Sequence, residues 1–251
     1  GGKIRVFVSG GASLPNTVYD NFNRLGITIH QGYGLTESAP VLAVTPYKKS
    51  RRSSVGFAVD GTKVEIKNAN FDGIGEIVAK GPSVMRGYYK NPEATERAII
   101  NDYLHTGDLG CFDDDGYLYI TGRSKEVIVT SAGKNVYPTE IEALYCQNEM
   151  IDELCAVGIS LTDAISEEVH VVIKPQENNE LAQEAVEQLI RGHMKTCGEE
   201  LPSYQQIHKS HFLWHDHLPK KGNGEIDRHQ VKRWVEKHTV TKSSEPSANL
   251  V

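Results

Sequence analysis

The first forty residues alternate between strand and helix patterns. The run 4–8 is mostly apolar and predicts a buried strand, and apolar residues recur at helical spacing between Pro15 and Gly26. Residues 27–29 predict a second strand. A strand, a glycine-rich turn, a helix and a strand form one α/β unit, and ligands of such units bind beyond the carboxyl ends of the strands. We expect the loop 31–37 at that edge, and we expect the chain to be part of a longer one because nothing precedes its first buried strand to cover it.

A different pattern begins at residue 54. Short segments of alternating polarity at 62–67 and 76–79 are separated by glycine-rich turns, which is typical of a small β-barrel or sandwich. A helix is predicted over residues 92–100, and Asp113–Gly116 predicts the turn of a hairpin. The fold expected for the first half is therefore an α/β unit followed by a small β-barrel.

Residues 118–134 join two differently built regions. Leu118–Ile120 predicts a strand that breaks at Thr121-Gly122, and Glu126–Thr130 predicts another strand, so that Arg123-Ser124-Lys125 forms the connection. Such a connection is either a plain tight turn or a hinge whose dihedral angles change between two domain orientations.

Beyond this connection, helices and strands alternate in a small α+β domain. A helix is expected from Pro138, strands at 154–159 and 169–173, and an amphipathic helix over 181–194. A strand over 207–214 and a helix from Asp227 complete the domain. We predict domains at residues 1–123 and 124–239, followed by a polar, Pro/Ser-rich and disordered tail at 240–251.

Composition excludes several classes of protein. The net charge of −6 lacks the basic footprint of a nucleic-acid-binding protein, and no apolar run reaches the length of a bilayer span. The four cysteines contain no Cys-x-x-Cys pair and favour reduced thiols over a disulfide framework or zinc site. These features predict a cytoplasmic protein and leave peripheral membrane association open.

Several polar residues could carry chemistry. The segment Tyr33–Glu37 offers an aromatic face for a base, a hydroxyl for a phosphate and a carboxylate for magnesium; the alternative is a turn with a solvated Glu37. Asp108 could accept hydrogen bonds from ribose hydroxyls or cap a local turn. Arg123 could bind hydroxyls or phosphate or form an exposed salt bridge. Four histidines between residues 208 and 217 favour a polar strand face over a metal site.

Six short motifs follow one another along the chain: Ser9–Ala12, Gln31–Ser38, Gly75–Tyr88, Tyr103–Asp108, Gly122–Lys125 and Gly133–Pro138. These motifs, in this order, resemble those of the adenylate-forming superfamily. The chain is most similar to the C-terminal part of an AMP-forming acyl-CoA synthetase of the long-chain fatty-acid type.

The resemblance implies a two-step reaction. A fatty acid or other carboxylic acid attacks ATP to give acyl-AMP and pyrophosphate, and the thiol of coenzyme A then displaces AMP. By motif, Thr36 would contact the α-phosphate, Glu37 would hold Mg²⁺ and Lys125 would be the hinge. Gly133 and Lys134 would bind coenzyme A. The nucleotide-binding set would be Gly11, Ala12, Gln31, Gly32, Tyr33, Gly34, Thr36, Asp108 and Arg123.

The sequence departs from the family pattern in two ways. The phosphate-binding loop and most of the acyl pocket precede the motifs present here, so we expect the chain to be inactive by itself. The late segment Pro-Lys-Thr-x-x-Gly-Lys-Ile/Val-x-Arg appears as Pro219–Arg228, with Glu225 where the adenylation lysine is expected. A glutamate there removes a charge-stabilising donor and adds repulsion, unless Lys220 or Lys221 reaches the site.

Two other hypotheses remain. One is a non-catalytic relative that binds adenylate, coenzyme A or a partner protein and lost adenylation through Glu225. The other, an acyl-AMP ligase that passes its adenylate to a carrier protein, is less favoured because the interval between Glu37 and Gly75 lacks the insertion that such relatives usually carry.

Overall fold

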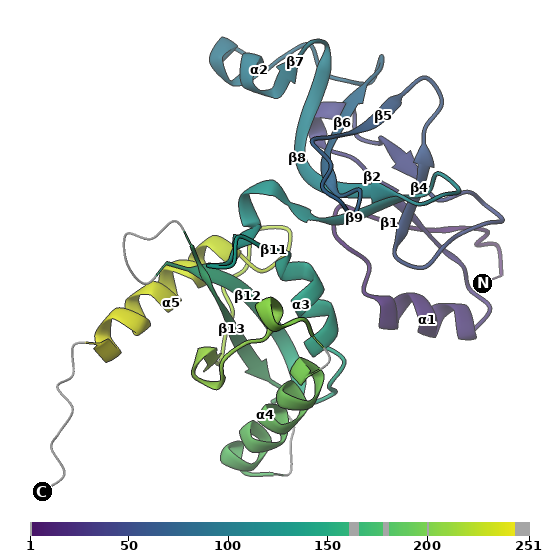
Figure 1. Ribbon diagram of the computed structural model, residues 1–251. Helices are drawn as coiled ribbons and strands as arrows, with labels where there is room; N and C mark the ends of the chain where they lie inside the picture. Colours follow the sequence, from purple (N-terminus) through teal and green to yellow (C-terminus); the bar gives the residue numbers. More distant parts are fainter. Residues whose placement is uncertain (1, 161–165, 178–180, 200, 244–251) are drawn as a thin grey trace, which may run out of the picture. The chain divides into compact units, whose positions relative to one another are not determined.

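The computed structural model describes residues 2–160, 166–177, 181–199 and 201–243. The chain divides into two compact units, Gly1–Lys125 and Glu126–Val251. Each unit has its own sheet and is described by itself (Figure 1). Within the described residues, none of the helices combines the length and hydropathy needed to cross a bilayer.

The first unit is built on one sheet with the strand order β1-β2-β3-β4-β9-β8-β6-β5, and β7 pairs with β8 at its side. Strands β1 and β2 are parallel, and the other neighbours are antiparallel. Its strands are β1 (Phe7–Gly10), β2 (Ile29–Tyr33), β3 (Ala43–Val44), β4 (Ser54–Ala58), β5 (Lys63–Lys67), β6 (Gly75–Lys80), β7 (Ile99–Ile100), β8 (Tyr103–Phe112) and β9 (Leu118–Arg123). Its helices are α1 (Asn16–Arg24), α2 (Pro92–Ala98) and the 3-10 helices η1 (Thr36–Ser38) and η2 (Ser124–Glu126).

The predicted β-barrel is wrong. Among the described residues the strand order has two free ends, β1 and β5, and the strands expected to close on themselves instead extend the sheet of the α/β unit. Alternation of polar and apolar residues requires only one covered face, and an open sheet satisfies it as well as a barrel does. The core of the sheet contains Ala43, Val55, Ile77 and Leu118.

Two local expectations also change. The first strand was predicted as buried, but Val8 is 68% exposed, and Phe7 is exposed as well. The loop predicted at 31–37 is partly strand, because β2 continues to Tyr33 before η1 begins at Thr36. The helix from residue 15 and the hairpin at Asp113–Gly116 are confirmed. The helix predicted over 92–100 ends at Ala98, because Ile99–Ile100 form β7.

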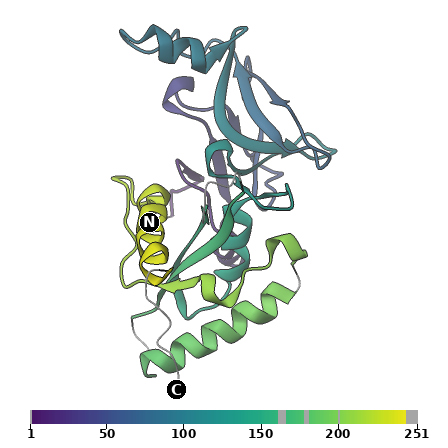
Figure 2. The same cartoon turned by 60° about the vertical axis from the view of Figure 1, so that its left-hand side comes forward.

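The second unit has three layers, which Figure 2 shows from the side. A sheet of β12 (Ile151–Ile159), β13 (Glu168–Pro175) and β14 (Phe212–Trp214) carries α3 (Pro138–Tyr145) and α4 (Gln183–Glu199) on one face and α5 (Arg228–Ser243) on the other. Leu154 and Ala156 pack into the first cluster, and Cys155 and Val157 into the second. Burial on both faces explains the run without charged or polar side chains from Leu154 to Ile159 in β12.

Several boundaries in the second unit differ from the predictions. A short hairpin of β10 (Ile128–Val129) and β11 (Asn135–Val136) replaces the strand expected over 126–130. The strand expected over 207–214 is shortened to β14 because the 3-10 helix η4 (Lys209–His211) precedes it. Helix α5 extends to Ser243, so residues 240–243 of the predicted disordered tail are helical. Residues 244–251 of that tail lie outside the described residues.

Candidate functional site

A buried carboxylate forms the centre of the candidate site in the first unit. Asp108 on β8 is 7% exposed and lies directly opposite Arg123 in the register of β8 and β9. The Arg123 Nε atom is 3.3 Å from Asp108 Oδ1, and the Tyr33 hydroxyl donates to Asp108 Oδ2 at 2.8 Å. Tyr33 and Asp108 are 75 residues apart in the chain, and pairing through β3, β4 and β9 brings their strands into one sheet.

The electrostatics of this cluster keep the Tyr33 hydroxyl protonated. Burial raises the pKa of Tyr33, and the negative charge of Asp108 raises it further. The phenol is therefore a hydrogen-bond donor at physiological pH, and it holds the carboxylate at a fixed orientation. Arg123 remains more than half exposed, which leaves its other nitrogens available to a ligand.

The glycine-rich predicted residues lie at the carboxyl ends of β1 and β2. Gly10 pairs with Gly32, so the following residues Gly11 and Ala12 are at the same edge as Gly34. Gly11 has φ +84°, a conformation that favours glycine. The Gln31 side chain is buried and donates to the Ser54 carbonyl oxygen at 3.2 Å, so its amide joins β2 to β4.

The turn after β2 depends on a glycine and a serine. A Cβ atom on Gly34 would lie 1.8 Å from the Pro40 carbonyl oxygen. Ser38 is fully buried, donates to the Leu35 and Pro40 carbonyl oxygens and accepts from the Leu35 amide. The sequence analysis assigns no function to Ser38. Its position directly after Glu37, in a short turn, is the feature of the sequence that could have indicated its role in holding the turn. These bonds hold Thr36 and Glu37 on a single turn of 3-10 helix.

Glu37 contacts the segment before α2. Its Oε1 atom accepts from the Tyr88 hydroxyl at 2.7 Å, and its carbonyl oxygen accepts from the Met85 amide at 2.7 Å. The hydrogen bond to Glu37 raises the pKa of Tyr88, so this phenol also stays a donor. The Glu37 carboxylate is half-buried, and a carboxylate suits Mg²⁺, which commonly takes one or two of them and completes its shell with phosphate and water.

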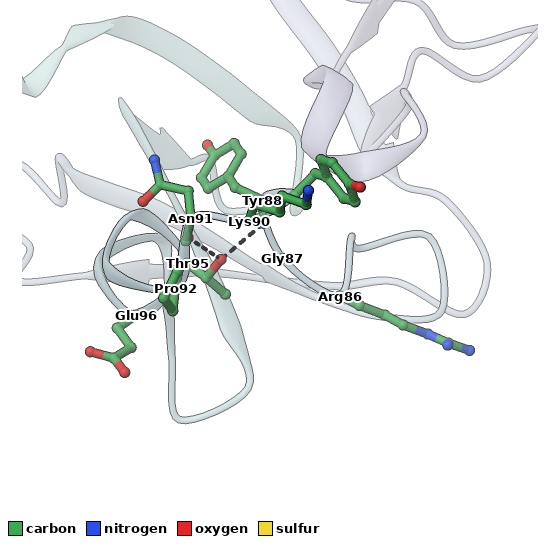
Figure 3. Close-up of a pocket in the computed structure, with 9 residues that line it drawn as sticks. Arg86, Gly87, Tyr88, Lys90, Asn91, Pro92, Thr95 and Glu96 are labelled. Carbon is green, nitrogen blue, oxygen red and sulfur yellow. Dashed lines mark hydrogen bonds between the residues drawn. The ribbon is translucent and has the colours of Figure 1, made fainter.

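A shallow pocket is formed by residues 86–92, Thr95 and Glu96. Thr95 Oγ1 accepts from the Tyr88 amide at 2.9 Å and donates to the Asn91 carbonyl oxygen at 2.9 Å (Figure 3). The Arg86 side chain extends away from the other labelled residues (Figure 3). The Thr95 hydroxyl thus binds the backbone of Tyr88, whose own hydroxyl contacts Glu37.

The predicted hinge and coenzyme A residues are exposed. Lys125 lies in η2, at the end of the first unit. Gly133 and Lys134 are at the tip of the β10–β11 hairpin, where Gly133 has φ +67° and its amide donates to the Thr130 carbonyl oxygen at 2.9 Å. A Cβ atom on Gly133 would meet no atom within 4 Å, so within this unit the glycine serves the turn.

Glu225 lies in a tight turn between β14 and α5. The Lys221 amide donates to the Glu225 carbonyl oxygen at 2.7 Å, and Lys221 Nζ is 3.5 Å from Glu225 Oε2. Lys220 points to a different partner, with its Nζ atom 2.5 Å from Glu153 Oε1. The position where the family pattern has lysine therefore carries a carboxylate paired with Lys221.

An arginine that sequence reasoning did not single out organises the second unit. Arg228 pairs with Glu126 at 3.0 Å and with Glu142 through both terminal nitrogens, and it donates to the Ala156 carbonyl oxygen at 2.6 Å. Burial alone lowers the pKa of this guanidinium, but the Glu142 hydrogen bonds and charge outweigh it and the pKa is raised. The sequence shows Arg228 as the last residue of the segment Pro219–Arg228. It does not show the partners Glu142 and Glu126, which lie 86 and 102 residues away.

The histidines between residues 208 and 217 lie around η4 and after β14. Among the described residues, no three or more His, Cys, Asp or Glu side chains are grouped as they would be to hold a metal ion. His208 and His211 lie at η4 rather than on a strand, so the strand-face interpretation is wrong for them. His211 stacks on the buried His170 with ring centroids 4.1 Å apart.

Comparisons with known proteins assign the chain to a family. Residues 1–89 match the family described as AMP-binding enzyme, and residues 125–238 match the AMP-binding enzyme C-terminal domain. The chain belongs to the AMP-binding enzyme family. The resemblance to adenylate-forming acyl-CoA synthetases is confirmed, and both matches describe different parts of the same family of enzymes.

Three relatives show what this family member is similar to. A long-chain-fatty-acid–CoA ligase of Escherichia coli is 32% identical over 92% of the chain and 40% of the relative. A 2-succinylbenzoate–CoA ligase of Geobacillus is 30% identical over 92% of the chain and 46% of the relative. The structure of the Bacillus subtilis o-succinylbenzoate–CoA synthetase with ATP and magnesium is 26% identical, with a TM-score of 0.75 over 92% of the chain and 47% of that protein. The chain thus spans less than half the length of these relatives.

Proposed function

We propose that this chain is the C-terminal part of an AMP-forming acyl-CoA synthetase. The whole enzyme would join a carboxylic acid to AMP, with release of pyrophosphate, and then transfer the acyl group to coenzyme A. The observation that carries the proposal is the Asp108 carboxylate, which is held by the Tyr33 hydroxyl at 2.8 Å and by Arg123 at 3.3 Å. A buried, oriented carboxylate beside an arginine fork suits the two vicinal hydroxyls of a ribose.

The remaining residues of the first unit support a nucleotide site around that carboxylate. The edge formed by Gly11, Ala12, Gly32 and Gly34 exposes backbone for the adenine, next to the Tyr33 ring. Thr36 would contact the α-phosphate, and Glu37 would supply one oxygen ligand to Mg²⁺. Magnesium, when bound, would neutralise charge on the phosphates. Gln31 would support the site indirectly, because the hydrogen bond from its side-chain amide to the Ser54 carbonyl oxygen holds the strand that carries Tyr33.

The second unit would be the mobile domain of the synthetase. In this proposal residues 1–123 complete the large domain, residues 124–239 form the small one and Lys125 is the hinge between two half-reactions. Exposure of Lys125 in a short 3-10 helix suits a hinge, because few contacts oppose a change of its dihedral angles. Gly133 and Lys134, at the exposed tip of a hairpin, would line the path of coenzyme A.

The substrate class is a finer proposal. Similarity to a long-chain-fatty-acid–CoA ligase favours a fatty acid, whereas similarity to 2-succinylbenzoate–CoA ligases supports an aryl acid. We propose a long-chain fatty acid and a cytoplasmic enzyme. Because the chain spans 40% of the fatty-acid ligase and contains no counterpart of the phosphate-binding loop, we also propose that it is inactive without the remaining part.

The ribose assignment is tested with the full-length protein. Asp108→Ala should weaken AMP binding about 10–100-fold, corresponding to the roughly 1.5–3 kcal/mol of hydrogen bonds to a charged group. Isothermal titration calorimetry with AMP measures the affinity, and circular dichroism checks the fold. Asp113→Ala is the matched control, since Asp113 is on the same hairpin but pairs with Arg51. Unchanged AMP affinity in Asp108→Ala would contradict the assignment.

Glu225 supports a second candidate, a non-catalytic relative that binds adenylate or coenzyme A. The carboxylate is where the family pattern has its adenylation lysine, and it is about one-third exposed. Acid-dependent exchange of pyrophosphate into ATP, measured with a panel of acids, separates the candidates. A synthetase exchanges pyrophosphate, whereas the non-catalytic relative binds AMP without exchange.

A further inference from the structure

The turn that carries Glu225 has a defined two-sided geometry. Lys220 and Ile226 form an antiparallel bridge, the Lys221 amide donates to Glu225, and the Asp227 amide donates to the Pro219 carbonyl oxygen at 2.7 Å. Residues directly opposite in an antiparallel pair have side chains on the same face, and successive residues point to opposite faces. Lys221 and Glu225 therefore share one face, and Lys220 and Ile226 share the other.

The face that Lys220 shares with Ile226 is the one through which the turn packs on the second unit, although the Lys220 side chain itself is 48% exposed. Ile226 packs against the apolar cluster of Cys155, Val157 and neighbouring residues between the sheet and α5. Lys220 pairs on the same side with Glu153 of β12. To bring the Lys220 ammonium to the Glu225 face, the turn would have to invert, which would withdraw Ile226 from that cluster and break the pair with Glu153.

The Lys221 ammonium needs no such rearrangement. It already lies 3.5 Å from the Glu225 carboxylate, on the face where the family pattern has its lysine. Gly224, with φ +89°, closes the turn, and its amide donates to the Lys221 carbonyl oxygen at 3.0 Å. The pattern's threonine and lysine positions are the two that face each other, and both differ in this chain: lysine replaces threonine at 221 and glutamate replaces lysine at 225.

We propose that Lys221 supplies the cation for adenylation in this enzyme and that Glu225 holds it across the turn. This inference rests on the proposed synthetase function. In the adenylation orientation the Lys221 ammonium would stabilise the negative charge that develops between the attacking carboxylate and the α-phosphate. It transfers no proton and forms no bond, so its contribution is electrostatic. Lys220 contributes to the fold of the turn through Glu153.

The test uses the full-length protein and compares Lys221→Thr with Lys220→Thr as the matched control. Acid-dependent ATP–pyrophosphate exchange should fall about 100–1,000-fold in Lys221→Thr, the effect of losing one preorganised donor, and less than about fivefold in Lys220→Thr. Thioester formation from supplied acyl-adenylate should change less than about threefold in both variants. That second reaction shows that the variants are folded and bind coenzyme A.

A rescue variant sharpens the test. Lys221→Thr combined with Glu225→Lys moves the ammonium to the opposite position on the same face, and exchange should return to within about tenfold of the natural protein. Exchange that survives in Lys221→Thr, or that is lost in Lys220→Thr instead, would overturn the inference. The inference would also be overturned if the natural protein showed no exchange while the rescue variant was active, a result that would still support the synthetase fold. If neither the natural protein nor the rescue variant shows exchange with any acid, although AMP binds, the proposed function fails.

Discussion

Arg228 should be the most stability-critical charged residue of the second unit. Its side chain is 20% exposed and joins the segment after the hinge, helix α3 and strand β12 through Glu126, Glu142 and Ala156. Removing one partner of a buried ion pair leaves uncompensated charge and typically costs about 3–5 kcal/mol. Arg228→Met keeps much of the apolar stem, so we expect the loss to come mainly from the two stranded carboxylates.

The two tryptophans make this loss measurable in one unit. Trp214 and Trp234 both lie in the second unit, so tryptophan fluorescence reports its unfolding separately from that of the first. With an m-value of about 1.5 kcal/mol/M in urea, the midpoint of Arg228→Met should fall by about 2–3 M. Arg233→Met, on the exposed side of the same helix, is the control and should change the unfolding free energy by less than about 0.5 kcal/mol.

A double variant separates charge from packing. Glu142 also accepts from the Ala156 amide at 2.8 Å, and Glu142→Gln keeps an acceptor there while removing the charge. Arg228→Met with Glu142→Gln should therefore be more stable than Arg228→Met alone, because fewer buried charges are unpaired. A midpoint change below about 0.5 M in Arg228→Met, or no recovery in the double variant, would refute the reasoning.

Three further predictions follow from the structure. Gly34→Ala should destabilise the first unit by about 1–3 kcal/mol because its Cβ would lie 1.8 Å from the Pro40 carbonyl oxygen, whereas Gly32→Ala, with open space around it, should be tolerated; thermal unfolding by circular dichroism compares them. Burial, and then the charge of His211, lowers the pKa of His170, so the unfolded state binds more protons and the second unit should lose stability as pH falls below about 6.5. His170→Gln should flatten part of that slope in urea titrations followed by fluorescence at pH 5 and pH 8. In the full-length enzyme, Lys125→Pro should slow one half-reaction much more than the other, with Lys125→Ala as control; equal slowing of both would contradict a hinge at this position.

Local patterns were sufficient for most elements. Alternation and turn residues predicted β5, β6 and the hairpin of β8 and β9, and helical spacing predicted α1 and α4. The order of motifs predicted the family, since each motif is short and contiguous in sequence. These features depend on neighbours within a few residues, and backbone geometry and side-chain periodicity act over that range.

Pairing between distant segments was decided by the tertiary structure. Alternation could not show that the predicted barrel strands extend the sheet of the α/β unit, because a polar and an apolar face fit either arrangement. The sequence likewise placed Tyr33 and Asp108 in separate motifs, and only the sheet order brings them within 2.8 Å.

The same distinction separates the two lysines before Glu225. In sequence they are adjacent and chemically identical, and both were candidates to replace the missing cation. The turn places Lys220 on the face of Ile226, which packs against the core, and pairs it with Glu153, whereas Lys221 and Glu225 lie on the other face. Side chains of successive residues in a paired segment point in opposite directions, so which one faces a ligand depends on which face the core covers, and that is a property of the folded unit.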